Sequence, residues 1–247
     1  MQQTLIFDLD DTLIHCNKYF YNVLDRFAFL MHSWFGGYGA TEEEIRNKQV
    51  EIDMESVKQL GFLIHHFPQS LVTTYEYYTD KYGRAAAPVE KDTLWKLGVS
   101  VFDFEAEPYP NMEETLDFLS EQGHVLHLYT GGEPVIQQRK VERLALERYF
   151  GPRIYVRHHK NNEALENILT EGRFDRDKTW MIGNSIRTDV VPALTAGIHA
   201  IHVEAVSEWV YNVVPIDVQP RGAFLLLKQL QEVPPAIEQY IRQAYSS

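Results

Sequence analysis

Short runs of large apolar residues recur along the chain, and several of them end in polar residues. The first run, Thr4 to Phe7, leads into Asp8, Asp10 and Asp11. A short, mostly apolar run of this kind is typical of a strand buried on both faces of a parallel sheet. Four later runs have the same character, so the sequence also predicts strands at 125–129, 154–157, 179–182 and 200–203.

Helical spacing of apolar residues dominates the chain after the first strand. A helix is expected from Asn17, which can cap it, to the glycines at 36, 37 and 39. Thr41 and Glu44 form the pattern of a capping box for a second helix. Further helices are predicted around 56–66, 69–82 and 89–97, and no strand is predicted before about residue 100. This helical insertion of about 90 residues has the size of a small separate domain.

From residue 108 onward, predicted strands and helices alternate. The helices are expected from Asn111 to Gly123, from Pro134 to about Tyr149, from Asn162, at 189–196 and near 225–230, before a polar tail. Alternation of this kind indicates a parallel sheet with right-handed crossovers. The expected fold class is α/β, with a Rossmann-like, doubly wound parallel sheet at 1–16 and 105–247 and an inserted all-helical domain at 17–104.

The composition narrows the classes of protein that the chain can represent. Apolar residues make up 45% of it, which supports a packed globular protein. The net charge of −12, without a long basic run, argues against a main role in binding nucleic acid or an anionic membrane. A single cysteine, Cys16, cannot form an internal disulfide and fits a reducing cytoplasm. No secretory or membrane-spanning segment is expected, and a monomer and a homodimer both remain open.

Four of the predicted strands carry polar residues at their carboxyl ends. These residues are Asp8 and Asp10, Thr130 and Gly131, Lys160, and Asn184 with Asp189 shortly after. In a parallel sheet such ends share one edge, where ligands bind. Carboxylates two residues apart point the same way and repel each other unless a cation lies between them, which predicts a divalent-metal site. Together these groups are the parts that phosphoryl transfer through an aspartyl-phosphate requires.

In the order and spacing of these residues, the chain resembles the haloacid dehalogenase-like hydrolases over about residues 1–16 and 105–205. The family's four motifs are matched by Asp8-x-Asp10-x-Thr12, by Thr130, by Lys160, and by Gly183-Asn184-Ser185 through Asp189. The helical insertion looks like the family's cap of the first type, which closes over the site and selects the substrate.

The resemblance implies a role for each of the matched residues. Asp8 would be the nucleophile and Asp10 the general acid and base. The implied phosphate-binding groups are Thr130, Gly131 and Lys160, and the implied Mg²⁺ ligands are Asp8, Asp10 through its backbone carbonyl, Asn184 and Asp189. The implied activity is the magnesium-dependent hydrolysis of a phosphate monoester of a small metabolite.

Two features depart from the family pattern or compete with it. Asn184 stands where the family usually has Asp, so weaker metal binding is expected, although an amide oxygen can still bind Mg²⁺. Lys140, in the preceding helix, competes with Lys160 as the phosphate-binding lysine. Three other functions stay open: a haloacid dehalogenase, against which Asp10 counts, a phosphosugar mutase, and a non-catalytic binding or regulatory module with a degenerate metal site.

The remaining conspicuous residues are interpreted as structural. Most aromatic residues of the insertion should form its core, and Tyr19, Tyr21 and Trp34 are the candidates to line a substrate pocket. The adjacent pairs His65-His66 and His158-His159 lack the spaced partners of a zinc site.

Overall fold

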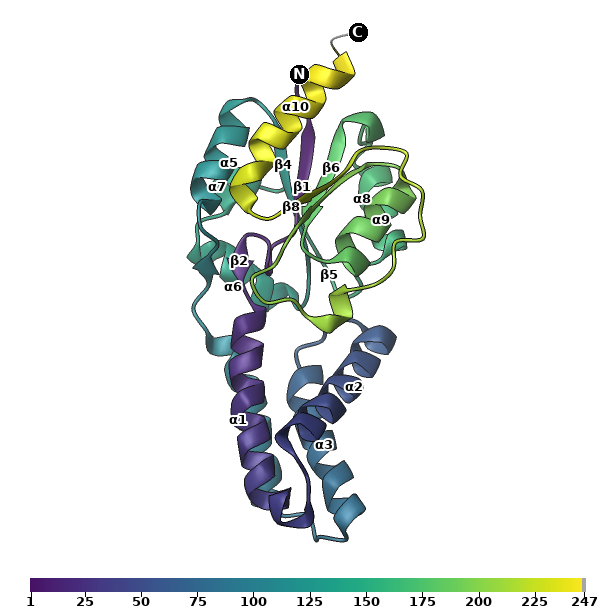
Figure 1. Cartoon of the computed structure of the whole chain (residues 1–247). Coiled ribbons are helices and arrows are strands. Elements are labelled where there is room, and N and C mark those ends of the chain that lie inside the picture. Colours follow the sequence, from purple (N-terminus) through teal and green to yellow (C-terminus); the bar gives the residue numbers. More distant parts are fainter. Residues whose placement is uncertain (246–247) are drawn as a thin grey trace. The chain divides into compact units, whose positions relative to one another are not determined.

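The computed structural model describes residues 1–245 and divides the chain into two compact units. One unit consists of residues 1–17 and the chain from residue 106 onward, and the other of residues 18–105. The first is an α/β unit and the second is helical (Figure 1).

The α/β unit is built on a six-stranded sheet in which every pair of neighbouring strands is parallel. In spatial order the strands are β5 (Ile154–Arg157), β4 (Val125–Gly131), β1 (Thr4–Phe7), β6 (Thr179–Gly183), β7 (His199–Val203) and β8 (Phe224–Leu227). Leu5, Ile6 and Phe7 are completely buried, as expected for a central strand covered on both faces. The predicted Rossmann-like α/β sheet is therefore confirmed.

Helices cover both faces of this sheet (Figure 1). The first face carries α5 (Met112–Glu121), α6 (Pro134–Arg143), α7 (Glu147–Phe150) and α10 (Val233–Tyr245), and the second carries α8 (Asn162–Glu171) and α9 (Val191–Ala196). The strand order reverses direction between β1 and β6, and doubly wound sheets bind ligands at the carboxyl ends of strands at such a switch point. Asp8 and Asn184 follow these two strands directly.

The prediction of a helix near residues 225–230 is wrong. Residues 224–227 form the edge strand β8, which pairs with β7 from Ala200↔Phe224 to Val203↔Leu227. A run of four apolar residues fits a strand as well as a helix. Here the run forms a strand because the edge of β7 offers backbone groups with which it pairs. The segment interpreted as a polar tail contains α10, whose Val233 and Ile237 are buried against the sheet.

Several predicted helix boundaries are also corrected. The helix expected from Pro134 to Tyr149 is interrupted at Ala145, whose φ of 50° is left-handed. The stretch at 56–66 is not a helix of its own, because α2 (Glu42–Leu60) ends at Gly61 and α3 (His66–Tyr82) begins later. Pro68 lies in the first turn of α3, where its missing N–H costs nothing.

The starts of three other predicted helices differ from the sequence pattern. Asn111 precedes α5 in a left-handed conformation and makes no side-chain cap bond. Asn161, not Asn162, caps α8 by accepting a hydrogen bond from Ala164 N. The helix predicted to begin at Asp189 begins with a π-helical turn, η4 (Ile186–Val190), that continues into α9.

The helical unit packs four helices around an aromatic core. They are α1 (Asn17–Phe35), α2, α3 and α4 (Pro88–Val99). The capping box at the start of α2 is confirmed: Glu44 N donates to the Thr41 hydroxyl and Thr41 N donates to the Glu44 carboxylate. Phe35, Tyr75 and Tyr78 are buried in the core. The three residues predicted to line a substrate pocket are only partly buried against this core: Tyr19, Tyr21 and Trp34.

A short antiparallel ribbon joins the segments by which the chain leaves and re-enters the α/β unit. It pairs β2 (Ile14–His15) with β3 (Glu107–Pro108), and neither strand was expected from the sequence. The rings of His15 and Tyr109 stack beside it, with their centroids 4.3 Å apart.

A buried carboxyl group in α2 makes the stability of the helical unit dependent on pH. Burial raises the pKa of Asp53 to about 7, and the hydrogen bond to Ser70 only partly opposes this shift. The folded-state pKa lies above the unfolded value, so folding disfavours the ionised form, and stability is lost as pH rises from about 4 through 7. We expect Asp53→Asn to be more stable than the parent at pH 8, by at most about 4 kcal/mol, and to gain much less at pH 5.

Urea unfolding at both pH values measures this difference. Glu55→Gln, which removes an exposed carboxylate from the same helix, is the control and should show nearly the same stability difference at both pH values. An Asp53→Asn effect that is equal at pH 5 and pH 8 would contradict the burial argument.

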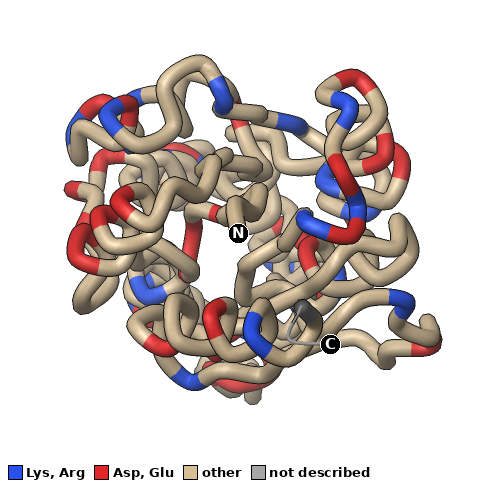
Figure 2. The backbone as a smooth tube through the Cα atoms, turned by 90° about the horizontal axis from the view of Figure 1, so that it is seen from above, with Lys and Arg blue, Asp and Glu red and all other residues tan. Residues whose placement is uncertain are grey.

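Charged residues of both signs are interspersed along the described chain. Figure 2 shows Lys and Arg positions scattered among Asp and Glu positions. Within residues 1–245, none of the helices combines the length and the apolar character that crossing a bilayer requires.

Candidate active site

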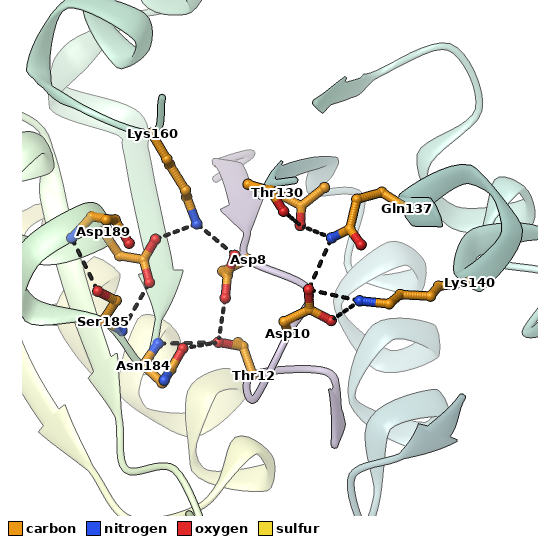
Figure 3. Close-up of polar contacts among 12 residues, drawn as sticks. Asp8, Asp10, Thr12, Thr130, Gln137, Lys140, Lys160, Asn184, Ser185 and Asp189 are labelled. Atoms are coloured by element: carbon orange, nitrogen blue, oxygen red, sulfur yellow. Dashed lines mark hydrogen bonds and ion pairs between the residues drawn. The ribbon is translucent and has the colours of Figure 1, made fainter. Parts of the chain in front are cut away.

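Asp8 lies at the carboxyl end of β1, where its carboxylate is almost completely buried. Its backbone N–H donates to Ile182 O at 2.9 Å and so continues the pairing of β1 with β6. One carboxylate oxygen, Oδ1, accepts a hydrogen bond from Lys160 Nζ at 2.5 Å, and Oδ2 accepts one from the Thr12 hydroxyl at 3.1 Å (Figure 3). Burial raises the pKa of Asp8 to about 7, while Lys160 opposes this shift. Both contacts orient the carboxylate for attack on an electrophile.

Asp10 is held by two residues of α6. Lys140 Nζ lies 2.7 and 2.9 Å from its two carboxylate oxygens, and Gln137 Nε2 donates to Oδ2 at 2.9 Å. The side chain of Asp11 faces elsewhere, because its carboxylate accepts hydrogen bonds from the backbone N–H groups of Cys16 and Asn17. Asp8 and Asp10 are therefore held by different lysines.

Thr130 connects β4 to the same group of residues. Its buried hydroxyl accepts a hydrogen bond from Gln137 Nε2 at 2.5 Å, so Gln137 bridges Thr130 and Asp10. Gly131, the last residue of β4, follows it at the edge of the sheet. This hydroxyl is suited to donate to an anionic ligand, because the bond from Gln137 uses only a lone pair of its oxygen and leaves its own O–H proton available.

Lys160 is a buried cation between two carboxylates. Besides Asp8, its ammonium forms an ion pair with Asp189, and it lies 5.0 Å from the centroid of the Tyr129 ring. Burial alone would lower the pKa of Lys160, but Asp189 and Asp8 outweigh it and hold the pKa above its ordinary value. The lysine is therefore charged and directed at Asp8, whereas Lys140 is directed at Asp10.

Asp189 is placed by the π-helical turn η4 after β6. One of its oxygens accepts a hydrogen bond from Ser185 N at 2.9 Å, and the other pairs with Lys160. The carboxylate lies so close to Gly183 that a Cβ on this glycine would stand 2.1 Å from Asp189 Oδ2. Glycine at position 183 is thus a steric requirement of this arrangement, and an extra residue in the helical turn is a frequent feature of functional sites.

Asn184 and Asp8 each place a side-chain oxygen that could bind a metal ion next to the Thr12 hydroxyl. The Thr12 hydroxyl lies 3.3 Å from Asn184 Oδ1 and 3.1 Å from Asp8 Oδ2, and it accepts a hydrogen bond from Asn184 N at 3.0 Å (Figure 3). A carboxylate oxygen and an amide oxygen are ligands that Mg²⁺ accepts, so this pair fits the predicted metal. The metal roles of Asp8, Asp10, Asn184 and Asp189 all stay predictions. The role of Asp10 would belong to its backbone carbonyl, and the Asp189 carboxylate is occupied by Lys160 and by the Ser185 N–H. Among residues 1–245, no three His, Cys, Asp or Glu side chains are grouped as a metal site.

All seven predicted site residues lie at the carboxyl end of the sheet or directly beyond it. Two residues that contact this group, Gln137 and Glu208, belong to none of the four sequence motifs. Gln137 lies three residues before Lys140 on α6, and residues at this spacing share one side of a helix. The spacing therefore indicates that Gln137 contacts the same group as Lys140. Glu208 contacts Asn184 from the loop after β7, where no motif marks it.

Comparison with known proteins identifies the family. The sequence profile of the haloacid dehalogenase-like hydrolases matches residues 2–197. The chain therefore belongs to the haloacid dehalogenase-like hydrolase family, as the four motifs predicted.

Individual relatives agree with this assignment. A phosphoglycolate phosphatase of Agrobacterium fabrum is 33% identical over 104 residues, which are 40% of this chain and 44% of that protein. A glyceraldehyde 3-phosphate phosphatase of Methanothermobacter thermautotrophicus is 25% identical over 213 residues, or 83% of this chain and 87% of that protein. A haloacid dehalogenase-like family hydrolase from Xanthomonas campestris matches the structure with a TM-score of 0.78 at 21% identity, covering 98% of this chain and 93% of that one. This structural likeness shows the shared fold.

Proposed function

We propose that the protein is a magnesium-dependent phosphatase that hydrolyses phosphate monoesters of small metabolites through an aspartyl-phosphate on Asp8. The observation that carries the proposal is the geometry of Asp8, whose two oxygens are held by Lys160 and Thr12 at the ligand-binding edge of the sheet. The curated relatives, which are phosphatases of small phosphorylated compounds, support the same reaction class.

The side chains of this site supply each step of the reaction. A carboxylate oxygen of Asp8 attacks phosphorus, the ester P–O bond breaks, and Asp10 gives a proton to the leaving oxygen. A water molecule then attacks the phosphoryl group, Asp10 takes its proton, and the bond between phosphorus and Asp8 breaks. Thr130, Gly131 and Lys160 bind the phosphoryl oxygens throughout, and the Thr130 hydroxyl donates its own proton while its oxygen accepts from Gln137 Nε2.

The ligands proposed for Mg²⁺ are Asp8, the backbone carbonyl of Asp10 and Asn184, with Asp189 nearby. When bound, the ion neutralises phosphoryl charge so that an anionic nucleophile can approach. Lys160 adds a second positive charge at Asp8.

The helical unit is proposed to be the substrate-selecting cap, with its domain boundaries at 17–104. The candidates to contact the substrate remain Tyr19, Tyr21 and Trp34. No role in binding nucleic acid or membranes is proposed, in line with the net charge of −12. The single Cys16 favours a reducing compartment such as the cytoplasm.

Competing activities of the same fold are less well supported. Asp10, held by Lys140 and Gln137 two residues from the nucleophile, is a proton-transfer group that dehalogenation does not need. A phosphosugar mutase would use the same site, and it differs by returning the phosphoryl group to a sugar. A binding module with a degenerate metal site would show no turnover.

Phosphate release from a panel of substrates tests the proposal and its dependence on metal. The panel contains phosphoglycolate, a triose phosphate, sugar phosphates, nucleotides and a chromogenic phosphate ester. We expect release from at least one small phosphate ester with Mg²⁺, and a loss of roughly 100-fold or more with chelator, because several kcal/mol of charge stabilisation is withdrawn. Equal rates with and without chelator, or isomerised sugar phosphate as the product, would contradict the proposal.

A further inference from the structure

The side-chain amide of Asn184 is oriented by the residues on its two sides. Its Oδ1 faces the Thr12 hydroxyl at 3.3 Å, and its Nδ2 donates to Glu208 Oε1 at 3.4 Å. The reversed amide would place its carbonyl oxygen against a carboxylate oxygen, two acceptors without a proton between them. Glu208 therefore directs the oxygen of Asn184 toward Thr12 and Asp8.

Glu208 is itself held in place by donors from its own loop. Its Oε1 accepts hydrogen bonds from Asn212 Nδ2 at 2.8 Å and from Trp209 N at 3.0 Å. Such an arrangement of N–H donors around one oxygen is suited to a carboxylate.

The loop that carries Glu208 is fastened to the rest of the α/β unit on both sides. Asn17 Nδ2 donates to Ser207 O at 2.8 Å, and Arg187 Nε donates to Tyr211 O at 2.6 Å. The contact between Glu208 and Asn184 is thus built into the fold of this unit.

We infer that Glu208 is a positioning residue that compensates for asparagine at position 184: it turns the amide oxygen toward the metal site and supplies the negative charge that the amide lacks. The inference rests on the proposed function, because it concerns Mg²⁺ bound at Asp8 and Asn184. An outer residue that orients a metal ligand typically changes metal affinity by 10- to 100-fold when it is removed.

Calorimetric titration of the metal-free protein with Mg²⁺ tests this role without measuring turnover. We expect Glu208→Gln to raise the dissociation constant of Mg²⁺ by roughly 10-fold or more, because the glutamine keeps the shape but not the charge. The matched control is Glu204→Gln. Glu204 lines, together with Asn184 and Glu208, a cavity of about 260 Å³, and its substitution removes the same charge. This control should change the constant by less than about twofold, because no contact with the Asn184 amide is removed.

Exchanging the charges of residues 184 and 208 distinguishes a role of Glu208 in Mg²⁺ binding from general damage to the fold. Asn184→Asp combined with Glu208→Gln moves the carboxylate from one residue to its neighbour. We expect the double variant to bind Mg²⁺ at least as tightly as the parent, although Glu208→Gln alone binds weakly. The thermal midpoints of all variants without Mg²⁺ show whether each is folded.

The possible results distinguish the inference from the proposed function. If the parent binds no Mg²⁺ and releases no phosphate, the proposed function fails. If the parent binds Mg²⁺ but Glu208→Gln binds it as tightly, or the double variant binds no better than Glu208→Gln, the role of Glu208 is overturned.

Discussion

Asp8→Asn is expected to lower turnover by roughly 10⁴-fold or more, because an amide is not a nucleophile toward phosphorus and no other carboxylate lies in its place. The variant should remain folded. Burial of Asp8 raises its pKa to about 7, so its ionised form costs stability at higher pH, and the neutral amide removes that cost. Lys160 keeps Asp189 as its partner in the variant. The thermal midpoint at pH 8 should therefore be equal to or higher than that of the parent.

Asp11→Asn is the matched control for this experiment. It makes the same chemical change three residues away, at a buried carboxylate that binds the backbone N–H groups of Cys16 and Asn17. We expect this variant to retain most of its turnover. Full activity of the Asp8→Asn protein would remove the nucleophile from the proposed mechanism.

Lys160→Met should reduce both turnover and stability. It leaves Asp8 and Asp189 buried without their shared cation, which we expect to cost about 3–5 kcal/mol of unfolding free energy. Loss of a positive charge at the phosphoryl group should lower kcat/KM by roughly 10²- to 10³-fold. Urea unfolding and the inhibition constant of inorganic phosphate measure the two effects.

Lys140→Met provides the comparison that decides between the two lysines. Its partner, Asp10, is one quarter exposed, so water can replace the ammonium and the loss of stability should be smaller. Phosphate should inhibit Lys140→Met about as well as the parent but inhibit Lys160→Met at least 10-fold more weakly. The opposite order would assign phosphate binding to Lys140.

The parts of the site that follow sheet strands were predictable from the sequence. Asp8, Thr130 and Asn184 each end an apolar run, and parallel strands bring such ends to one edge of the sheet. The sequence does not by itself distinguish Lys160 from Lys140 as the phosphate-binding lysine, and the structure places the two lysines at different carboxylates.

Other parts depend on tertiary contacts that leave no local pattern. Glu208 reaches Asn184 only because its loop is fastened by Asn17 and Arg187, residues far from it in the sequence. The short apolar run of β8 fits a helix as well as a strand, and only the free edge of β7 distinguishes them. The direction of the Asp189 carboxylate follows from a π-helical turn that residue spacing does not indicate.

An aspartyl-phosphate on Asp8 can be detected by the mass of the Asp8 peptide after the Asp10→Asn protein is mixed with Mg²⁺ and 4-nitrophenyl phosphate and quenched with acid. Nitrophenolate leaves without protonation, so the first step should proceed, whereas the second step should be slow because the base is missing. We expect a burst of nitrophenolate of about one per chain and one phosphoryl group on Asp8 that hydroxylamine removes. Continued turnover with no phosphoryl group on this peptide, or a phosphoryl group on another residue, would contradict the aspartyl-phosphate mechanism.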